Sequence, residues 1–333
     1  MNNEEMRIVI EGELKKILDE GIPEAYCGMR EFLAYHMGWE GPGAGLEAQG
    51  KRIRPVLVLL CAISAGGDWQ AALPAAAAVE YVHNFSLIHD DIQDQSPLRR
   101  GRETVWVKWG IAQAINAGDL MFTLAFVALQ KLAETLSPTA ALQAHHVLQA
   151  TCIRLTGGQY LDLAYEKARQ MPDGAYWPMI EGKTAALLAC CAELGALAGR
   201  ATSEQRSCYR EFGIKLGLAF QVQDDWLGIW GNAAQTGKST ESDLVSGKKT
   251  FPVSAGLANQ SRFAKRWMAG PVFSADVPEV IALLEKEGIK EKTLQTANKL
   301  TNEALAAFDQ ASPTEAGKQM VNDLVHKLLT RDN

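Results

Sequence analysis

Three aspartates near the end of an apolar segment have the spacing that most clearly suggests chemistry. Asp90, Asp91 and Asp94 stand in the sequence HDDIQD, and at about 100° per residue Asp90 and Asp94 share one face of a helix. Unneutralised carboxylates this close repel by roughly a few kcal/mol at an effective dielectric constant of about 20, so they need a cation. Oxygen ligands alone favour Mg²⁺. Taken by itself, such a run is more often a solvated helix end.

A second pair of adjacent aspartates favours a functional interpretation of the first. Asp224 and Asp225 follow Gln221 in AFQVQDDWLGIWG. This segment is otherwise very apolar, and paired charges are costly there unless they are used. Two such pairs in one helical chain are difficult to explain as solvated surface residues.

Cationic residues near the ends of predicted helices could bind anionic groups. Lys+Arg number 33 against 39 Asp+Glu, a net charge of -6, so the whole protein offers no electrostatic reason to bind nucleic acid or an anionic membrane surface. Each cation alone fits a surface salt bridge, but together their positions suit two phosphate groups. The candidates are Lys51 and Arg54 in GKRIRP, Arg99 and Arg100 after the first aspartates, Lys183 in EGKTA, Lys238 in QTGKS and Lys248 in SGKKTFP.

Long helices are predicted to position these residues. Apolar residues recur three and four positions apart, and alternating strand-like runs are almost absent. No Pro/Gly/Ser-rich linker divides the chain, so we predict a single all-α domain over residues 1–333, a bundle of long, mostly antiparallel helices. The predicted helices cover residues 55–65, 73–95, 104–135, 138–168, 177–199 and 203–230.

Composition and the termini favour a cytoplasmic globular protein. Apolar residues make up 47% of the chain, which excludes disorder. The six cysteines form no CxxC motif and are predicted to be buried reduced thiols. The N-terminus lacks the basic and apolar regions of a signal peptide, and the most apolar stretch, 185–198, is too short to span a bilayer. No transmembrane segment is therefore predicted.

The ordered set of motifs resembles the trans-prenyl diphosphate synthases, a family whose two aspartate-rich motifs face each other across a helical bundle. The similarity runs from GKRIRP through HDDIQDQSPLRRG, TGGQYLDL, GKTA and FQVQDDWLG to TGKSTESDLVSGKKTFP. The resemblance implies the isoprenoid synthase fold, with a central cavity, and a Mg²⁺-dependent prenyltransferase. This enzyme would condense isopentenyl diphosphate with an allylic diphosphate. The resemblance also implies three Mg²⁺ ions, bound with the allylic diphosphate, and a homodimer.

The resemblance also gives individual residues a role. The two motifs would bind the metal, which acts as a Lewis acid for loss of the allylic diphosphate. Thr184 and Gln221 could steady developing charge with their oxygens. The implied metal ligands are Asp90, Asp91, Asp94, Asp224 and Asp225. The residues implied to bind isopentenyl diphosphate are Lys51, Arg54, His83 and Arg100. Those implied to bind or activate the allylic diphosphate are Arg99, Lys183, Thr184, Gln221, Lys238 and Lys248.

One position departs from the family pattern, and another bears on product length. Gly228 stands where the second motif commonly has a third aspartate, which affects the expected metal affinity. Phe85 and Ser86 precede the first motif, and a single aromatic residue there resembles geranylgeranyl (C20) synthases more than farnesyl (C15) ones. By helical angle Phe85 is turned roughly 140° from Asp90, so the C20 product rests on the resemblance. A C15 or a longer product stays open.

Three other classes of protein share some of these sequence features. A terpene cyclase shares the bundle and the ionisation step but needs no isopentenyl site, so Lys51, Arg54, His83 and Arg100 argue against it. A non-catalytic regulatory subunit would be expected to have lost its aspartate motifs. A di-iron bundle needs two ExxH pairs, and the sequence has one, at Glu80 and His83. Glu80 is therefore predicted to be a salt-bridging residue.

Overall fold

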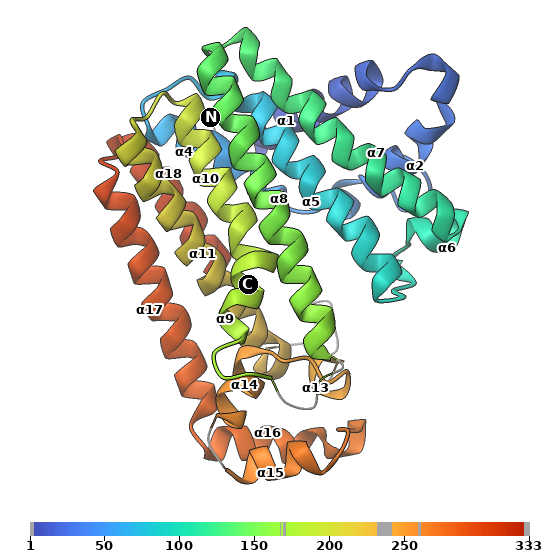
Figure 1. Ribbon diagram of the computed structural model, residues 1–333, viewed down its shortest axis with the longest axis vertical. Coiled ribbons are helices and arrows are strands. Elements are labelled where there is room, and N and C mark those ends of the chain that lie inside the picture. The colour runs from blue at the N-terminus through green and yellow to red at the C-terminus, as the bar shows by residue number, and fades with distance from the viewer. Residues whose placement is uncertain (1–2, 167, 169–170, 232–241, 259–260, 330–333) are drawn as a thin grey trace. The chain divides into compact units, whose positions relative to one another are not determined.

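The computed structural model is helical almost throughout, which confirms the predicted all-α fold (Figure 1). In the part of the chain that it describes, the only strands are β1 (Leu98–Arg99) and β2 (Arg102–Glu103), which form one antiparallel hairpin. The structure describes residues 3–166, 168, 171–231, 242–258 and 261–329.

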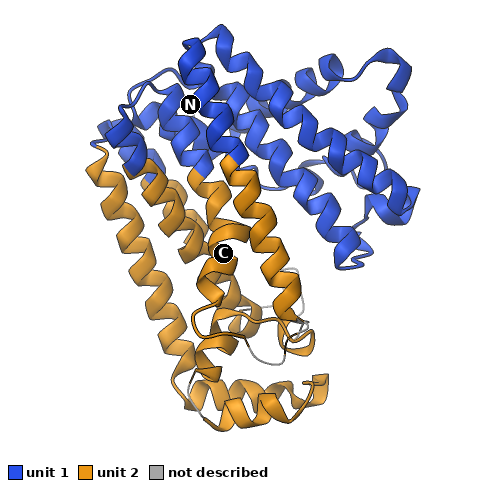
Figure 2. Ribbon diagram, in the orientation of Figure 1, with its two compact units in different colours: residues 1–149, 190–207, 312–321 blue, residues 150–189, 208–311, 322–333 orange. Residues whose placement is uncertain are grey.

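The chain divides into two compact units, coloured separately in Figure 2. Unit 1 comprises residues 1–149, 190–207 and 312–321, and unit 2 comprises residues 150–189, 208–311 and 322–333. The first aspartate motif belongs to unit 1 and the second to unit 2. A single domain over the whole chain stays a prediction. Four of the five unit boundaries fall within α8 (Pro138–Glu166), α10 (Ala186–Ala198), α11 (Ser203–Trp230) and α18 (Glu315–Leu329), and the fifth, at 311/312, lies just before α18.

Unit 1 is built around two long apolar helices, α5 and α7, which pack side by side (Figure 1). Gly118 of α7 allows this approach, because a Cβ at that position would collide with the ring of His89 on α5. Pro74 lies in the first turn of α5, where its fixed φ and missing N–H suit a helix start. The helices that lie wholly in unit 1 are α1 (Asn3–Gly21), α2 (Gly28–His36), α3 (Leu46–Gln49), α4 (Ile53–Ser64), α5 (Leu73–Gln93), α6 (Val105–Trp109) and α7 (Ile111–Gln130), with 3₁₀ turns at Glu24–Tyr26, Trp69–Ala72 and Lys131–Glu134.

Unit 2 contains several short helices and one long helix around its own apolar core. Val253, Phe263 and Leu284 are fully buried in it, and they come from three consecutive helices, α14, α15 and α16. The elements that lie wholly in unit 2 are α9 (Tyr176–Ile180), a π-helical turn (Glu181–Ala185), α13 (Ser242–Val245), α14 (Phe251–Leu257), α15 (Arg262–Ala269), a 3₁₀ turn (Ser274–Asp276), α16 (Val277–Lys286) and α17 (Ile289–Gln310).

The predicted helix boundaries are right in some places and wrong in others. The helix predicted over 203–230 matches α11. The one predicted over 104–135 is broken at Gly110, whose φ of 84° lies in the left-handed region and ends α6 before α7 begins. The one predicted over 177–199 is divided by the π-helical turn.

Two features bear on the predicted compartment. All six cysteines are free thiols, and four of them are buried, whereas Cys27 is exposed and Cys208 is intermediate. The segment Ile111–Glu134 is long and apolar enough to cross a membrane by length and composition, and 39% of its most apolar stretch is buried within the protein. Core helices of soluble proteins share these properties, so the lack of a transmembrane segment stays a prediction.

Candidate active site

The first aspartate motif lies at the end of α5 in unit 1. Asp91 is 2% exposed, and Arg99 donates from Nε to both of its carboxylate oxygens at 2.9 Å. Burial raises the pKa of Asp91, and the Arg99 guanidinium opposes that rise. Asp90 is partly buried, whereas Asp94, the residue after the last turn of α5, is exposed. The motif therefore consists of one buried, paired carboxylate and two that are accessible to solvent.

The β1–β2 hairpin holds the two arginines that follow this motif. Its turn residues, Arg100 and Gly101, have φ values of 52° and 73°, as in the turns that suit two-residue hairpins. Arg100 donates from Nη1 to the carbonyl oxygen of Ala48 at 2.8 Å. A Cβ at Gly50 would lie 2.7 Å from Arg100 Cζ, so only glycine lets the guanidinium lie against this loop. The hairpin thereby brings Arg100 to the segment that precedes α4.

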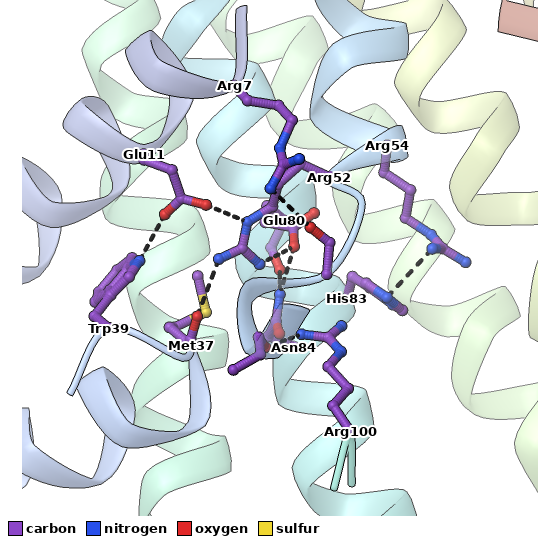
Figure 3. Close-up of polar contacts among 12 residues, drawn as sticks. Arg7, Glu11, Met37, Trp39, Arg52, Arg54, Glu80, His83, Asn84 and Arg100 are labelled. Atoms are coloured by element: carbon purple, nitrogen blue, oxygen red, sulfur yellow. Dashed lines mark hydrogen bonds and ion pairs between the residues drawn. The ribbon is translucent and has the colours of Figure 1, made fainter. Parts of the chain in front are cut away.

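Arg52 anchors the start of α4 in the interior of unit 1 (Figure 3). Its φ of 50° is left-handed, and its guanidinium forms ion pairs of 2.7 Å with Glu11 and with Glu80. It also donates to the carbonyl oxygen of Met37 at 3.2 Å, and Asn84 donates to Glu80 at 2.8 Å. The prediction that Glu80 is a salt-bridging residue is confirmed.

This anchor positions two of the predicted isopentenyl ligands. Arg54 lies in the first turn of α4, and its Nη1 is 3.2 Å from Nε2 of His83 (Figure 3). A guanidinium can only donate, so Nε2 accepts and the imidazole is neutral with its proton on Nδ1. Lys51 is exposed, just before the anchored Arg52.

Positive charge accumulates around these residues. Burial lowers the pKa of His83 well below its usual value, and the nearby guanidinium groups of Arg54 and Arg100 lower it further. The pKa of His36 is lowered in the same way, first by burial. Burial also lowers the pKa of Arg100, with Arg52 the next cause. An anion bound among these guanidinium groups would offset their positive charge.

The predicted chain-length residues lie on two different sides of α5. The ring of Phe85 packs on Phe122 of α7 with centroids 4.8 Å apart, and Phe122 packs on Phe126 at 5.1 Å. These three rings form an aromatic row along the α5–α7 pair. Ser86 instead donates from Oγ to the carbonyl oxygen of His83 at 2.8 Å. Their effect on product length stays a prediction.

The second motif, on α11 in unit 2, is organised around Asp225, which is 5% exposed. Its Oδ2 accepts from the Tyr176 hydroxyl and from the Phe251 backbone N–H, both at 2.7 Å, and its Oδ1 accepts from Gln221 Nε2 at 2.9 Å. The Gln221 oxygen accepts from the Thr184 hydroxyl at 2.7 Å. Burial raises the pKa of Asp225 to about 7, although these hydrogen bonds oppose the rise. The predicted use of Thr184 and Gln221 to steady developing charge stays a prediction.

Lys183 lies in the π-helical turn, a rare conformation that is frequent at functional sites. A Cβ at Gly158 would collide with the backbone of Lys183, and one at Gly182 would lie 2.7 Å from the carbonyl oxygen of Arg154. The two glycines therefore let the turn press against α8. In this position Lys183 forms an ion pair with Asp162 of α8.

The structure describes only one of the last two predicted cationic residues. Lys238 lies outside the described residues. Lys248 is half-buried, and its neighbour Lys249 is buried. Lys249 donates to the carbonyl oxygen of Gly247 at 2.7 Å, and its Nζ lies 5.6 Å from the centroid of the Trp267 ring. Of the two adjacent lysines, Lys248 is the one left near the surface.

A cavity of about 860 Å³ in unit 2 adjoins the groups that hold Asp225. Tyr176, Trp177 and Phe251 form part of its wall, and their rings contact one another. Among the described residues that line this cavity, none was predicted to bind substrate. The predicted substrate residues therefore lie elsewhere.

The residues of each motif, taken separately, fit magnesium binding that substrate would complete. Within the described ranges, no three His, Cys, Asp or Glu side chains are gathered closely enough to hold a metal ion. Mg²⁺ is usually bound through one or two carboxylates, together with substrate phosphates and waters. Accessible carboxylates without soft ligands match that preference. The identity of the ligands stays a prediction.

The side chains and the backbone N–H that hold the two motifs in place were not predicted from the sequence. Arg52 stands between two predicted cations in GKRIRP, but its burial depends on Glu11 and Glu80, which are distant in the sequence. Tyr176 and the N–H of Phe251 lie 49 and 26 residues from Asp225. Tyr176 belongs to none of the quoted motifs, and Phe251, although it ends the motif SGKKTFP, takes part through its backbone N–H, which no residue type indicates.

Cations gathered in unit 1 and two anchored aspartate motifs indicate an all-α enzyme that acts on phosphorylated substrates with a divalent metal ion. The chain belongs to the polyprenyl synthetase family, whose model matches residues 44–282.

Named relatives narrow the activity to short-chain products. The chain is 38% identical over 294 residues to a geranylgeranyl diphosphate synthase of Mycobacterium tuberculosis, covering 85% of this chain and 83% of the relative. It is 36% identical over 313 residues to a (2E,6E)-farnesyl diphosphate synthase of Mycobacterium bovis, covering 91% and 86%. The protein is thus a Mg²⁺-dependent transferase that condenses isopentenyl diphosphate with allylic diphosphates to a short-chain trans-prenyl diphosphate.

Solved structures support the same fold. A polyprenyl synthetase from Streptomyces coelicolor superposes with a TM-score of 0.88 at 34% identity, with 98% of each chain covered. A geranylgeranyl pyrophosphate synthase from Corynebacterium glutamicum, solved in complex with isoprenyl diphosphate and magnesium, superposes with a TM-score of 0.85 at 25% identity, covering 99% of this chain and 100% of that one. The fold is that of the isoprenoid synthases.

Proposed function

We propose that the two aspartate motifs act on one pair of diphosphate substrates, with Asp90, Asp94 and Asp224 as the direct metal ligands. The burial and existing partners of Asp91 and Asp225 support this division. These two carboxylates then hold the motifs in position. When bound, Mg²⁺, of which we propose three ions, neutralises charge on the allylic diphosphate and favours its departure.

Isopentenyl diphosphate is the ligand that we propose for the cations of unit 1. The observation that carries this proposal is that Nη1 of Arg54 lies 3.2 Å from Nε2 of His83, while the hairpin holds Arg100 against Ala48, just before α4. A bound diphosphate would offset the positive charge gathered there. Lys51 and Arg54 complete the group. The residues proposed for the allylic diphosphate are Arg99, Lys183, Thr184, Gln221, Lys238 and Lys248.

In the reaction that we propose, the allylic carbon–oxygen bond breaks and the double bond of isopentenyl diphosphate attacks the resulting cation. A proton is then lost to a nearby base, for which the departing diphosphate is a candidate. The cationic side chains hold the two diphosphates in position relative to each other for this step. The apolar helices exclude water, which would otherwise capture the cation.

The division of the cations between two substrates can be tested by kinetics. Arg54→Ala should raise KM for isopentenyl diphosphate by about 10-fold or more and change KM for the allylic substrate by less than about 2-fold. Lys183→Ala, the matched change in the other group, should show the reverse pattern. Equal rises in both constants for Arg54→Ala would contradict the division.

The product that we propose is geranylgeranyl diphosphate. The aromatic row that Phe85 forms with Phe122 supports a block to growth beside α5. Identification of the product alcohols after incubation with isopentenyl diphosphate and each allylic primer should give C20. Phe85→Ala should lengthen the product and Ser86→Phe should shorten it toward C15. Unchanged lengths in both variants would place the block on another helix.

We also propose a cytoplasmic homodimer. α7 exposes Ile111 and Ile115, one turn apart, at 53% and 44%, and a second copy of the chain would cover this apolar strip. Free cysteines fit the reducing cytoplasm. Ile111→Lys/Ile115→Lys should convert the dimer to a monomer in sedimentation analysis, and an unchanged dimer would exclude this face.

A further inference from the structure

Gly228, which stands where relatives commonly have a third aspartate, is one turn after Asp224 on α11. Residues four apart share a helix face. A Cβ at Gly228 would lie 2.8 Å from Oδ2 of Asp243 and 3.7 Å from its Cγ. The space into which a side chain at position 228 would project is therefore already filled by a carboxylate.

The backbone of Asp243 is held by hydrogen bonds within the described residues. Its carbonyl oxygen accepts from the Lys248 backbone N–H at 3.0 Å and from the Ser246 hydroxyl at 3.3 Å. The next residue, Leu244, is 1% exposed in the core of unit 2. No hydrogen bond or ion pair joins the Asp243 carboxylate to any part of the chain that the structure describes.

The Asp243 carboxylate lies on the side of α11 that carries Asp224, because it occupies the place of a side chain at position 228. A carboxylate near a metal-binding aspartate pair is unfavourable unless a cation is shared with it.

We propose that Asp243 supplies the third carboxylate of the second motif, in place of a side chain at position 228, and contributes to binding the divalent cation. This inference rests on the proposed function of the second motif. The chemistry of the donor fits, because carboxylate oxygens are the ligands that Mg²⁺ prefers. Glycine at position 228 leaves this space to the Asp243 carboxylate, which would have to move if a side chain stood there.

Metal binding tests this role without reference to turnover. Mn²⁺ binding would be measured by electron paramagnetic resonance, with inorganic pyrophosphate present. Asp243→Asn keeps the shape of the side chain and removes its charge, so we expect Mn²⁺ affinity to fall by about 10- to 100-fold. Glu279→Gln, the same change of charge at an exposed position of unit 2, is the matched control and should bind Mn²⁺ as the unmodified protein does.

A swap of the two positions gives the sharper test. Asp243→Gly should weaken Mn²⁺ binding, and Gly228→Asp/Asp243→Gly should recover most of it, because the carboxylate returns to the same space from α11. Unchanged affinity in Asp243→Asn, or a double variant no better than Asp243→Gly, would overturn the proposal.

A third variant separates this proposal from the proposed function. If Asp224→Asn loses Mn²⁺ binding while Asp243→Asn does not, only the role of Asp243 is wrong. If neither variant changes Mn²⁺ affinity, the second motif does not bind the metal, and the proposed function fails with it.

Discussion

The two aspartate motifs are held in place by different kinds of partner. In unit 1, Asp91 is paired with the guanidinium of Arg99. In unit 2, Asp225 is held by three neutral donors, the Tyr176 hydroxyl, the Gln221 amide and the Phe251 backbone N–H. Both carboxylates are buried, and burial raises the pKa of each. The same sequence pattern is therefore anchored by charge in one unit and by hydrogen bonds in the other.

This difference indicates which half can rearrange when substrate binds. Arg99, at 30% side-chain exposure, is also a proposed ligand of the allylic diphosphate, so it can exchange a carboxylate for a phosphate when substrate binds. The donors to Asp225 include a backbone N–H and the hydroxyl of a buried tyrosine, both neutral and neither proposed to bind substrate. We expect the second motif to be the more rigid of the two.

The largest effect on activity is expected from loss of a metal-binding aspartate in either motif, because both motifs are proposed to act on the same substrates. Asp90→Ala and Asp224→Ala should each lower kcat by about 10³-fold or more, because developing charge loses its metal. Steady-state kinetics with Glu279→Ala as the control would measure this. Activity near that of the unmodified protein in either variant would show that only one motif is catalytic.

A large loss of stability is expected where unit 1 depends on charge. Arg52→Ala leaves the buried Glu80 and the partly buried Glu11 without their cation, which should lower the free energy of unfolding by about 3–5 kcal/mol. Arg30→Ala breaks an exposed pair with Asp19 and Glu40 and should cost less than about 1 kcal/mol. Equal losses in urea titrations of the two variants would refute the anchoring role of Arg52.

A smaller loss is expected where unit 2 depends on hydrogen bonds. Tyr176→Phe removes one donor to Asp225 and keeps the ring packing, so it should cost about 1–3 kcal/mol in urea unfolding. The two other donors remain in place. A loss as large as that of Arg52→Ala would mean that neutral and charged anchors do not differ.

The smallest effect is a dependence of stability on pH. The folded-state pKa of His83 lies well below 6.5 because of burial and the nearby guanidinium groups. The unfolded chain therefore takes up a proton as pH falls below about 6.5 while the folded chain does not, and stability decreases. His83→Gln should flatten this decrease in thermal unfolding from pH 7 toward about 5. The exposed His146→Gln is the control, and an equal slope in both variants would exclude this contribution.

The fold and the motif residues could be predicted from the sequence for physical reasons. Helical periodicity is local, so α11 was predicted at its observed bounds, and paired aspartates in an apolar segment need a cation wherever they lie. Contacts between distant residues are not encoded in this way. The Arg52 anchor, the Tyr176 hydrogen bond and the carboxylate of Asp243 beside Gly228 all depend on tertiary packing. Even the break at Gly110 became clear only from its left-handed backbone.

The central claim, that both motifs serve one substrate pair, can be tested directly by the binding of an unreactive allylic thiolodiphosphate in the presence of Mg²⁺. Calorimetric titration of Asp90→Asn and of Asp224→Asn should show Kd raised by about 100-fold or more in each variant, because each motif contributes metal to the same diphosphate. Affinity equal to that of the unmodified protein in one of the two variants would contradict the claim, since that motif would then play no part in holding the allylic substrate.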